Sequence, residues 1–109
     1  MHELAIARNI VAICEAGRDG RPVVSVVVGV GELAAVSAHA LSFSFELAAA
    51  GTALEGATLT VEPIKATARC ASCGVTLTLE SHLEQCTCGQ SKLTWLSGGE
   101  LVVRRLELG

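Results

Sequence analysis

The chain has 109 residues and a formal net charge of −3, and half of its residues are hydrophobic although only Phe43, Phe45 and Trp95 are aromatic. This length suits one compact domain with room for a small inserted module. The eight lysines and arginines form no basic run and the apolar stretches are interrupted by charge, so nucleic-acid binding, a membrane span and a signal peptide are not expected, and a cytoplasmic location is predicted.

The first half of the chain contains two helical patterns separated by a strand pattern. Between Glu3 and Ala16, apolar residues recur every three or four positions, as on one face of an amphipathic helix. The stretch from Pro22 to Gly31 is rich in valine and has the length of a strand. A second helix is predicted between Ser37 and Ala50, with Ser37 as its N-cap and Gly51 ending it.

Two further strands are predicted on either side of a cysteine-rich segment, at Ala57 to Ile64 and at Leu101 to Leu108. The fold class that follows is α+β, with two helices packed on a small, mostly antiparallel sheet and an inserted zinc-ribbon module. If the two flanking strands pair with each other, residues 1–66 and 93–109 form a discontinuous α+β domain, and residues 67–92 form the zinc-binding module.

Four of the five cysteines are arranged as two close pairs, each followed by glycine. Two residues separate Cys70 from Cys73, whereas a single residue separates Cys86 from Cys88. Four thiolates satisfy tetrahedral Zn²⁺ and leave no open position, so a structural zinc site is predicted. The residues from Val75 to Leu79 are expected to run out and return as a short hairpin between the pairs.

Several alternatives to this ligand set remain open. His82 could replace one sulfur, because the spacing of the second pair is unusually short. A thioredoxin-like redox pair is less favoured, because the Cys-X-X-Cys segment does not open a helix after a βαβ pattern. The fifth cysteine, Cys14, lies on the apolar face of the first helix and is interpreted as a core residue.

The amino terminus, Met1-His2-Glu3, carries a second set of metal donors. The α-amine of Met1, the amide nitrogen of His2 and the Nδ1 atom of His2 can chelate one ion, and Ni²⁺ and Cu²⁺ prefer such planar nitrogen donors. Glu3 could add an oxygen or orient the imidazole, and His39 could be a fourth donor. The first helix is expected to begin directly after this tripeptide.

These features together resemble a known family, the HypA/HybF hydrogenase maturation proteins. The resemblance is carried along nearly the whole chain by the N-terminal Met-His-Glu, VVVGVGEL at 26–33, LSFSFE at 41–46, GTALEGA at 51–57, the cysteine turns, and Gly-Glu-Leu at 99–101. One departure is the second cysteine pair, which is usually Cys-X-X-Cys in relatives.

The resemblance implies a nickel metallochaperone that works with a partner GTPase, delivers Ni²⁺ to the large subunit of a [NiFe]-hydrogenase, and is not an enzyme. It places nickel on His2 and its adjoining backbone with Glu3 in support, and structural zinc on Cys70, Cys73, Cys86 and Cys88. The alternative function is a structural zinc-ribbon module for protein interaction, which would leave the Met-His-Glu start unexplained.

Overall fold

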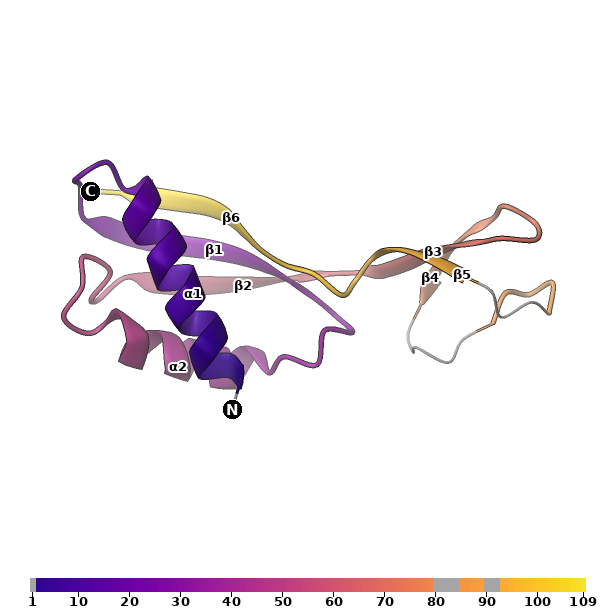
Figure 1. Cartoon of the computed structure of the whole chain (residues 1–109), viewed down its shortest axis with the longest axis horizontal. Helices are drawn as coiled ribbons and strands as arrows, with labels where there is room; N and C mark the ends of the chain where they lie inside the picture. The colour runs from indigo at the N-terminus through magenta and orange to yellow at the C-terminus, as the bar shows by residue number, and fades with distance from the viewer. Residues whose placement is uncertain (1, 80–84, 90–92) are drawn as a thin grey trace. The chain divides into compact units, whose positions relative to one another are not determined.

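A computed structural model describes residues 2–79, 85–89 and 93–109, and its elements follow the order α1, β1, α2, β2, β3, β4, β5, β6 (Figure 1). The chain forms two compact units. The first contains residues 1–29, 36–62 and 102–109, and the second contains residues 30–35 and 63–101. The module predicted at 67–92 therefore lies within the second unit.

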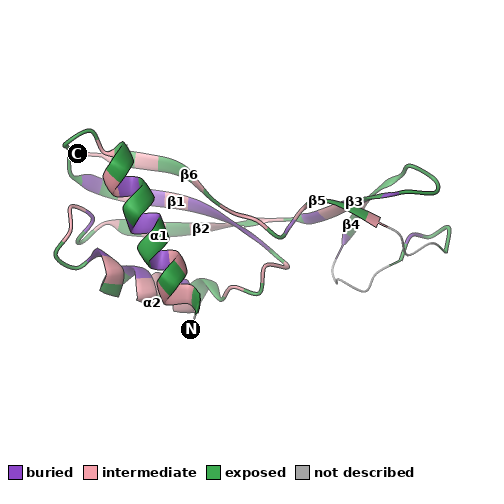
Figure 2. Cartoon of the chain, viewed as in Figure 1, coloured by how far each residue is buried: buried purple, intermediate pink, exposed green. Residues whose placement is uncertain are grey.

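Helix α1 (His2–Gly17) buries the stripe that its sequence pattern predicted. Ala7, Ile10, Val11 and Cys14 are all buried, and their spacing of three or four residues places them on one face of the helix. The buried stripe alternates with exposed residues along the ribbon of α1 (Figure 2). The predicted amphipathic helix is confirmed.

Helix α2 (Ala38–Ala49) contacts α1 and buries Leu41, Phe45 and Ala49, which lie four residues apart on one face. Ser37 caps its start, because the Ser37 side chain accepts a hydrogen bond from the Ala40 backbone N–H at 3.2 Å. Gly51 follows its end with φ +77°, a conformation that glycine adopts without a steric penalty. The predicted cap is confirmed.

The sheet of three strands has the order β2-β1-β6, formed by β1 (Val23–Gly31), β2 (Thr58–Ile64) and β6 (Leu101–Leu108). The central strand β1 buries Val23, Val26, Val28 and Val30. The suggestion that the strands flanking the cysteines pair with each other is wrong, since β1 lies between β2 and β6.

A second antiparallel sheet, with the order β4-β3-β5, carries the cysteine segment. It consists of β3 (Ala66–Cys70), β4 (Thr76–Leu79) and β5 (Leu93–Ser97). Strand β4 pairs back onto β3, with Ala66 opposite Leu79 and Arg69 opposite Thr76. Residues 76–79 therefore form a single strand that pairs with β3, whereas the sequence predicted that Val75 to Leu79 would run out and return as a hairpin between the cysteine pairs. Ala66, Ala68 and Leu79 make its small core, with Leu33, Leu77 and Leu93 packed against it.

Gly31 and Gly98 lie where backbone segments of the second unit approach each other closely. The Leu33 backbone N–H donates to the Gly98 carbonyl at 3.0 Å, and the Gly31 N–H donates to the Glu100 carbonyl at 2.7 Å. A Cβ atom on Gly98 would lie 2.3 Å from the Ala66 Cα, and φ at Gly98 is +108°. A side chain at Gly98 is therefore excluded by both space and backbone conformation.

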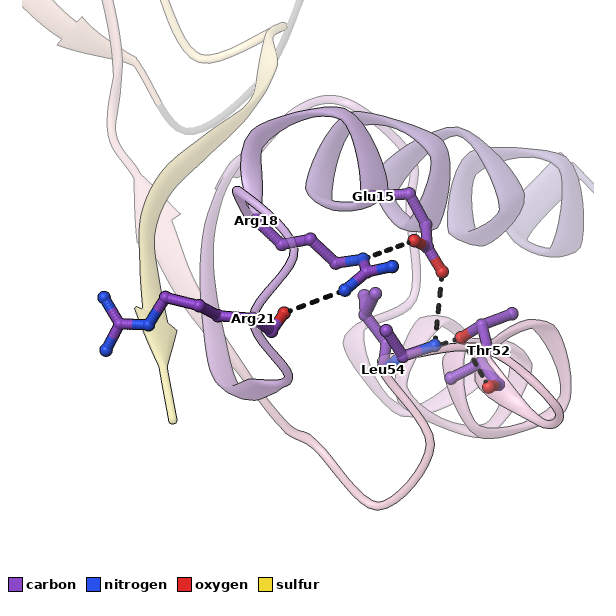
Figure 3. A network of polar contacts seen from close by, with 7 residues as sticks. Glu15, Arg18, Arg21, Thr52 and Leu54 are labelled. Atoms are coloured by element: carbon purple, nitrogen blue, oxygen red, sulfur yellow. Dashed lines mark hydrogen bonds and ion pairs between the residues drawn. The ribbon is translucent and has the colours of Figure 1, made fainter.

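Polar contacts connect the end of α1 to the turn that follows α2 (Figure 3). The Glu15 carboxylate accepts from Arg18 Nε at 2.7 Å and from the Ala53 backbone N–H at 3.2 Å. Thr52 Oγ1 donates to the Ala49 carbonyl and accepts from the Leu54 N–H. The hydrogen bonds from Arg18 and from the Ala53 backbone lower the pKa of Glu15, and the bond from Arg18 has the larger effect. Among the described residues, neither helix is long and apolar enough to cross a membrane.

Candidate metal centres

The first cysteine turn connects β3 to β4. The Gly74 N–H donates to the Cys70 carbonyl at 2.9 Å and the Cys70 N–H donates to the Val75 carbonyl at 2.9 Å. Gly74 has φ +77°, so the chain reverses immediately after Cys73 without the steric penalty that a side chain would bring. The turn therefore holds both thiols at the end of the sheet.

The second turn, within residues 85–89, is tighter. The Gly89 N–H donates to the Cys86 carbonyl at 2.8 Å, and Gly89 has φ +92°. Because Cys86 and Cys88 are separated by a single residue, both thiols lie inside this one turn. His82, the alternative ligand, lies outside the described residues.

The structure brings the four predicted cysteines together. Their sulfur atoms all lie within 4.8 Å of one another. The Sγ atoms of Cys70 and Cys88 are 3.7 Å apart, and those of Cys73 and Cys86 are 3.6 Å apart. Two ligands at about 2.3 Å from a tetrahedral zinc ion would be separated by about 3.8 Å. The short spacing of the second pair therefore does not prevent a tetrahedral sulfur set.

The backbone of the first turn also favours a thiolate at Cys70. Hydrogen bonds from the Cys73 and Ser72 backbone, with the nearby thiols of Cys73 and Cys88, lower the pKa of Cys70 to about 6 against the opposing effect of burial. The pKa of Cys73 is raised. There the Val75 backbone N–H, which lowers the pKa, is outweighed by the neighbouring sulfurs of Cys86 and Cys70 and by desolvation. A cation could bind where the thiolate is already favoured.

The predicted nickel residues lie at the start of α1. The helix begins at His2, so His2 and Glu3 belong to its first turn. The expectation that the helix begins only after these residues is therefore wrong. A carboxylate is favoured there, because the N-terminal end of a helix carries partial positive charge. The His2 side chain is 57% exposed and that of Glu3 is 13% exposed. Met1 lies outside the described residues.

Glu3 connects this end of α1 to the start of α2. Its Oε2 atom accepts a hydrogen bond from the Ser37 backbone N–H at 3.3 Å and lies 3.9 Å from His2 Nε2. Ser37 had been predicted as a helix cap, but its contact with Glu3 was missed. No local signal could have revealed it, because 34 positions separate the two residues.

The other residues considered in the sequence analysis have separate positions. His39 is exposed in the first turn of α2, two residues from Ser37. Cys14 is buried on α1, and burial, followed by the charge of Glu15, raises the pKa of its thiol. Cys14 is not part of the four-cysteine cluster.

Comparison with known proteins identifies the family of this chain. A family model described as "Hydrogenase/urease nickel incorporation, metallochaperone, hypA" matches residues 1–108. The chain belongs to the HypA family. The family resemblance inferred from the sequence motifs is therefore confirmed, and with it the general role in nickel incorporation during hydrogenase maturation.

Relatives match nearly the whole length of this chain. The hydrogenase maturation factor HypA of Geobacter sulfurreducens is 36% identical over 109 residues, which cover 99% of both chains. That of Nostoc sp. is 37% identical over 108 residues, covering 99% of this chain and 96% of the relative.

Two solved structures confirm the fold. The solution structure of the nickel metallochaperone HypA from Helicobacter pylori matches with a TM-score of 0.73 at 22% identity, covering 99% of this chain and 97% of that one. A second solution structure of a HypA protein matches with a TM-score of 0.74 at 23% identity, covering 99% and 96%. The predicted α+β fold with a zinc-ribbon module is thus confirmed.

Proposed function

We propose that this chain binds Ni²⁺ at its amino terminus and delivers it to the large subunit of a [NiFe]-hydrogenase, acting with a maturation GTPase. The ligands are the Met1 α-amine and the His2 amide nitrogen and imidazole, supported by the Glu3 carboxylate. The proposal makes the chain a metal carrier rather than an enzyme. The observation that carries it is the contact of Glu3 with both His2 and the start of α2.

The position of His2 in the first turn of α1 suits this chelate. A metal bound to a deprotonated amide nitrogen requires a backbone N–H that is not already donating within a helix. The first four N–H groups of an α-helix have no intrahelical acceptor, and His2 begins α1. Binding at this amide would therefore leave the helical hydrogen bonds intact.

The Glu3 contacts explain how an otherwise mobile chain end could present an ordered site. Chain ends are usually flexible unless they are held by the fold. Glu3 is largely shielded and is held by the Ser37 N–H, so its carboxylate has a defined position near the imidazole. Such a partner orients a metal-binding imidazole.

The four cysteines are proposed to hold a structural Zn²⁺. The support is the fit between the observed sulfur separations and a tetrahedral ion. The second sheet has a core of only a few small side chains, so a metal would contribute much of its stability. A thiolate zinc centre also suits the reducing cytoplasm, where the chain is proposed to act.

Nickel titration of the zinc-loaded protein tests the terminal site. The protein with its native amino terminus is compared with His2→Ala and with a variant carrying one additional glycine before Met1. In the native protein we expect one bound Ni²⁺ per chain, with the absorption spectrum of nickel in planar nitrogen coordination. Both variants should lose this spectrum. Because the donors must lose protons, lowering the pH should release nickel.

Equal nickel binding by all three proteins would refute the terminal chelate. It would favour the alternative function, a structural zinc-ribbon module for protein interaction. As a matched control, His39→Ala changes a histidine in the first turn of α2 and tests whether that imidazole is an additional donor. Transfer is measured separately, by adding metal-free hydrogenase large subunit and the GTPase and following nickel between the proteins.

A further inference from the structure

The four-cysteine cluster brings sulfur atoms of both turns together. The sulfur contacts of Cys70 with Cys88 and of Cys73 with Cys86 join one turn to the other. Their sulfur separations of 3.7 Å and 3.6 Å exceed the length of a disulfide bond by about 1.6 Å.

Each of these two pairs combines one exposed and one buried cysteine. Cys73 and Cys88 are exposed, whereas Cys70 and Cys86 are buried with exposed fractions of 1% and 3%. A small oxidant in solvent therefore reaches one member of each pair first. The other member lies behind it at contact distance.

We propose that the cysteine cluster is a peroxide-sensitive switch that, on oxidation, forms two disulfides across the turns, Cys73–Cys86 and Cys70–Cys88. One cysteine of each pair reacts with the peroxide, and its partner across the turns is the resolving residue. Oxidation of one pair removes two of the four proposed zinc ligands, while the new covalent link keeps the two turns together. This inference concerns the cysteine cluster and does not depend on nickel binding at the terminus.

The chemistry uses a hydroperoxide as the oxidant. The thiolate of one cysteine attacks the O–O bond, so that an S–O bond forms, the O–O bond breaks, and the leaving oxygen takes a proton to become water. The thiol of its partner then attacks the resulting sulfenic sulfur, the S–S bond forms, and the S–O oxygen leaves with a proton as a second water. Each disulfide consumes two thiols and one hydrogen peroxide.

Protease sites in the chain allow the linkage to be mapped. Trypsin cleaves after Arg69 and Lys92, and a glutamyl endopeptidase cleaves after Glu80 and Glu84. The double digest places Cys70 and Cys73 on a peptide of residues 70–80, and Cys86 and Cys88 on a peptide of residues 85–92. Disulfides across the turns keep these two peptides joined, whereas disulfides within each turn release them separately.

The experiment treats the full-length, zinc-loaded protein with hydrogen peroxide, blocks remaining thiols by alkylation, and analyses the double digest by mass spectrometry without reduction. We expect the two peptides to remain joined, with roughly one zinc ion released per chain to a colorimetric chelator. Reduction should separate the peptides. Separate peptides carrying internal disulfides, or cysteines oxidised only to sulfinic acid, would overturn the proposal.

Single variants distinguish the two possible cross-turn pairings. In Cys73→Ser we expect Cys70–Cys88 to form and Cys86 to be alkylated, and in Cys88→Ser we expect Cys73–Cys86 to form and Cys70 to be alkylated. Formation of Cys70–Cys86 in either variant would contradict the assigned pairs. Mapping of the wild-type protein remains decisive for cross-turn linkage if either variant fails to fold, and Cys14→Ser is the control that should leave the digest pattern unchanged.

Discussion

The Glu3 carboxylate accepts a hydrogen bond from the Ser37 backbone N–H at 3.3 Å, and through this contact the first turn of α1 is held against the start of α2. The same oxygen lies 3.9 Å from His2 Nε2. One carboxylate thus lies beside two helix N-termini and the proposed nickel imidazole. Each partial positive charge of these helix ends favours the ionised carboxylate.

Replacing this carboxylate should weaken nickel binding. We expect Glu3→Gln to reduce the affinity for Ni²⁺ by about 10-fold, because partners of metal-ligating groups commonly contribute 10–100-fold. Isothermal titration calorimetry of the zinc-loaded protein measures this change. Glu46→Gln removes an exposed carboxylate on α2 and should leave the affinity unchanged. Equal affinities for wild type and Glu3→Gln would contradict a supporting role for Glu3.

The cap of α2 should contribute measurably to stability. Ser37→Ala removes the oxygen that accepts the Ala40 N–H, and we expect the free energy of unfolding to fall by about 1 kcal/mol. Ser37→Asp retains a capping oxygen and should lose much less. Urea denaturation followed by far-ultraviolet circular dichroism measures both. A loss in Ser37→Asp as large as that in Ser37→Ala would argue against capping as the cause.

The close approach at Gly98 should make that position intolerant of a side chain. Gly98→Ala would place a Cβ atom 2.3 Å from the Ala66 Cα at a positive φ, and we expect it to destabilise the second unit by about 1–3 kcal/mol. Gly99→Ala is the matched control, because a Cβ on Gly99 meets no atom within 4 Å. Denaturant unfolding followed by Trp95 fluorescence compares them. Equal unfolding midpoints would disprove the steric argument.

The low pKa of Cys70, about 6, should appear as a thiolate in the metal-free protein near neutral pH. Its folded pKa lies below the ordinary thiol value of about 8.5. Ionisation of Cys70 therefore stabilises the fold fully above about pH 8.5, and this contribution declines as the pH falls and is lost below about pH 6.

Ultraviolet absorbance of the thiolate during a pH titration measures this ionisation. We expect a step near pH 6 that disappears in Cys70→Ser and persists in Cys14→Ser, because burial raises the pKa of Cys14. If wild-type protein shows no thiolate absorbance below pH 7, the stabilising effect assigned to the first turn is incorrect. The complementary measurement is the free energy of unfolding of the metal-free protein between pH 6 and pH 8.5.

Some strands could not be found from sequence for an identifiable reason. Strand β3 alternates small and polar residues, with Ala66 and Ala68 facing its core. Alanine is depleted in strands, so this alternation carried little signal. The sheet forms because Leu33, Leu77 and Leu93, from three separate segments, pack against those alanines.

The sequence by itself determined the features that depend on local spacing. Periodicity located both helices, Ser37 was recognisable as a cap, and two close cysteine pairs indicated one metal module, since each pair must lie on one turn. Only the tertiary structure decided that β1 separates β2 from β6, that Cys70 faces Cys88 and Cys73 faces Cys86, and that Glu3 meets Ser37. These are contacts between residues far apart in the chain, and their partners are selected by strand register and packing, which no local pattern encodes.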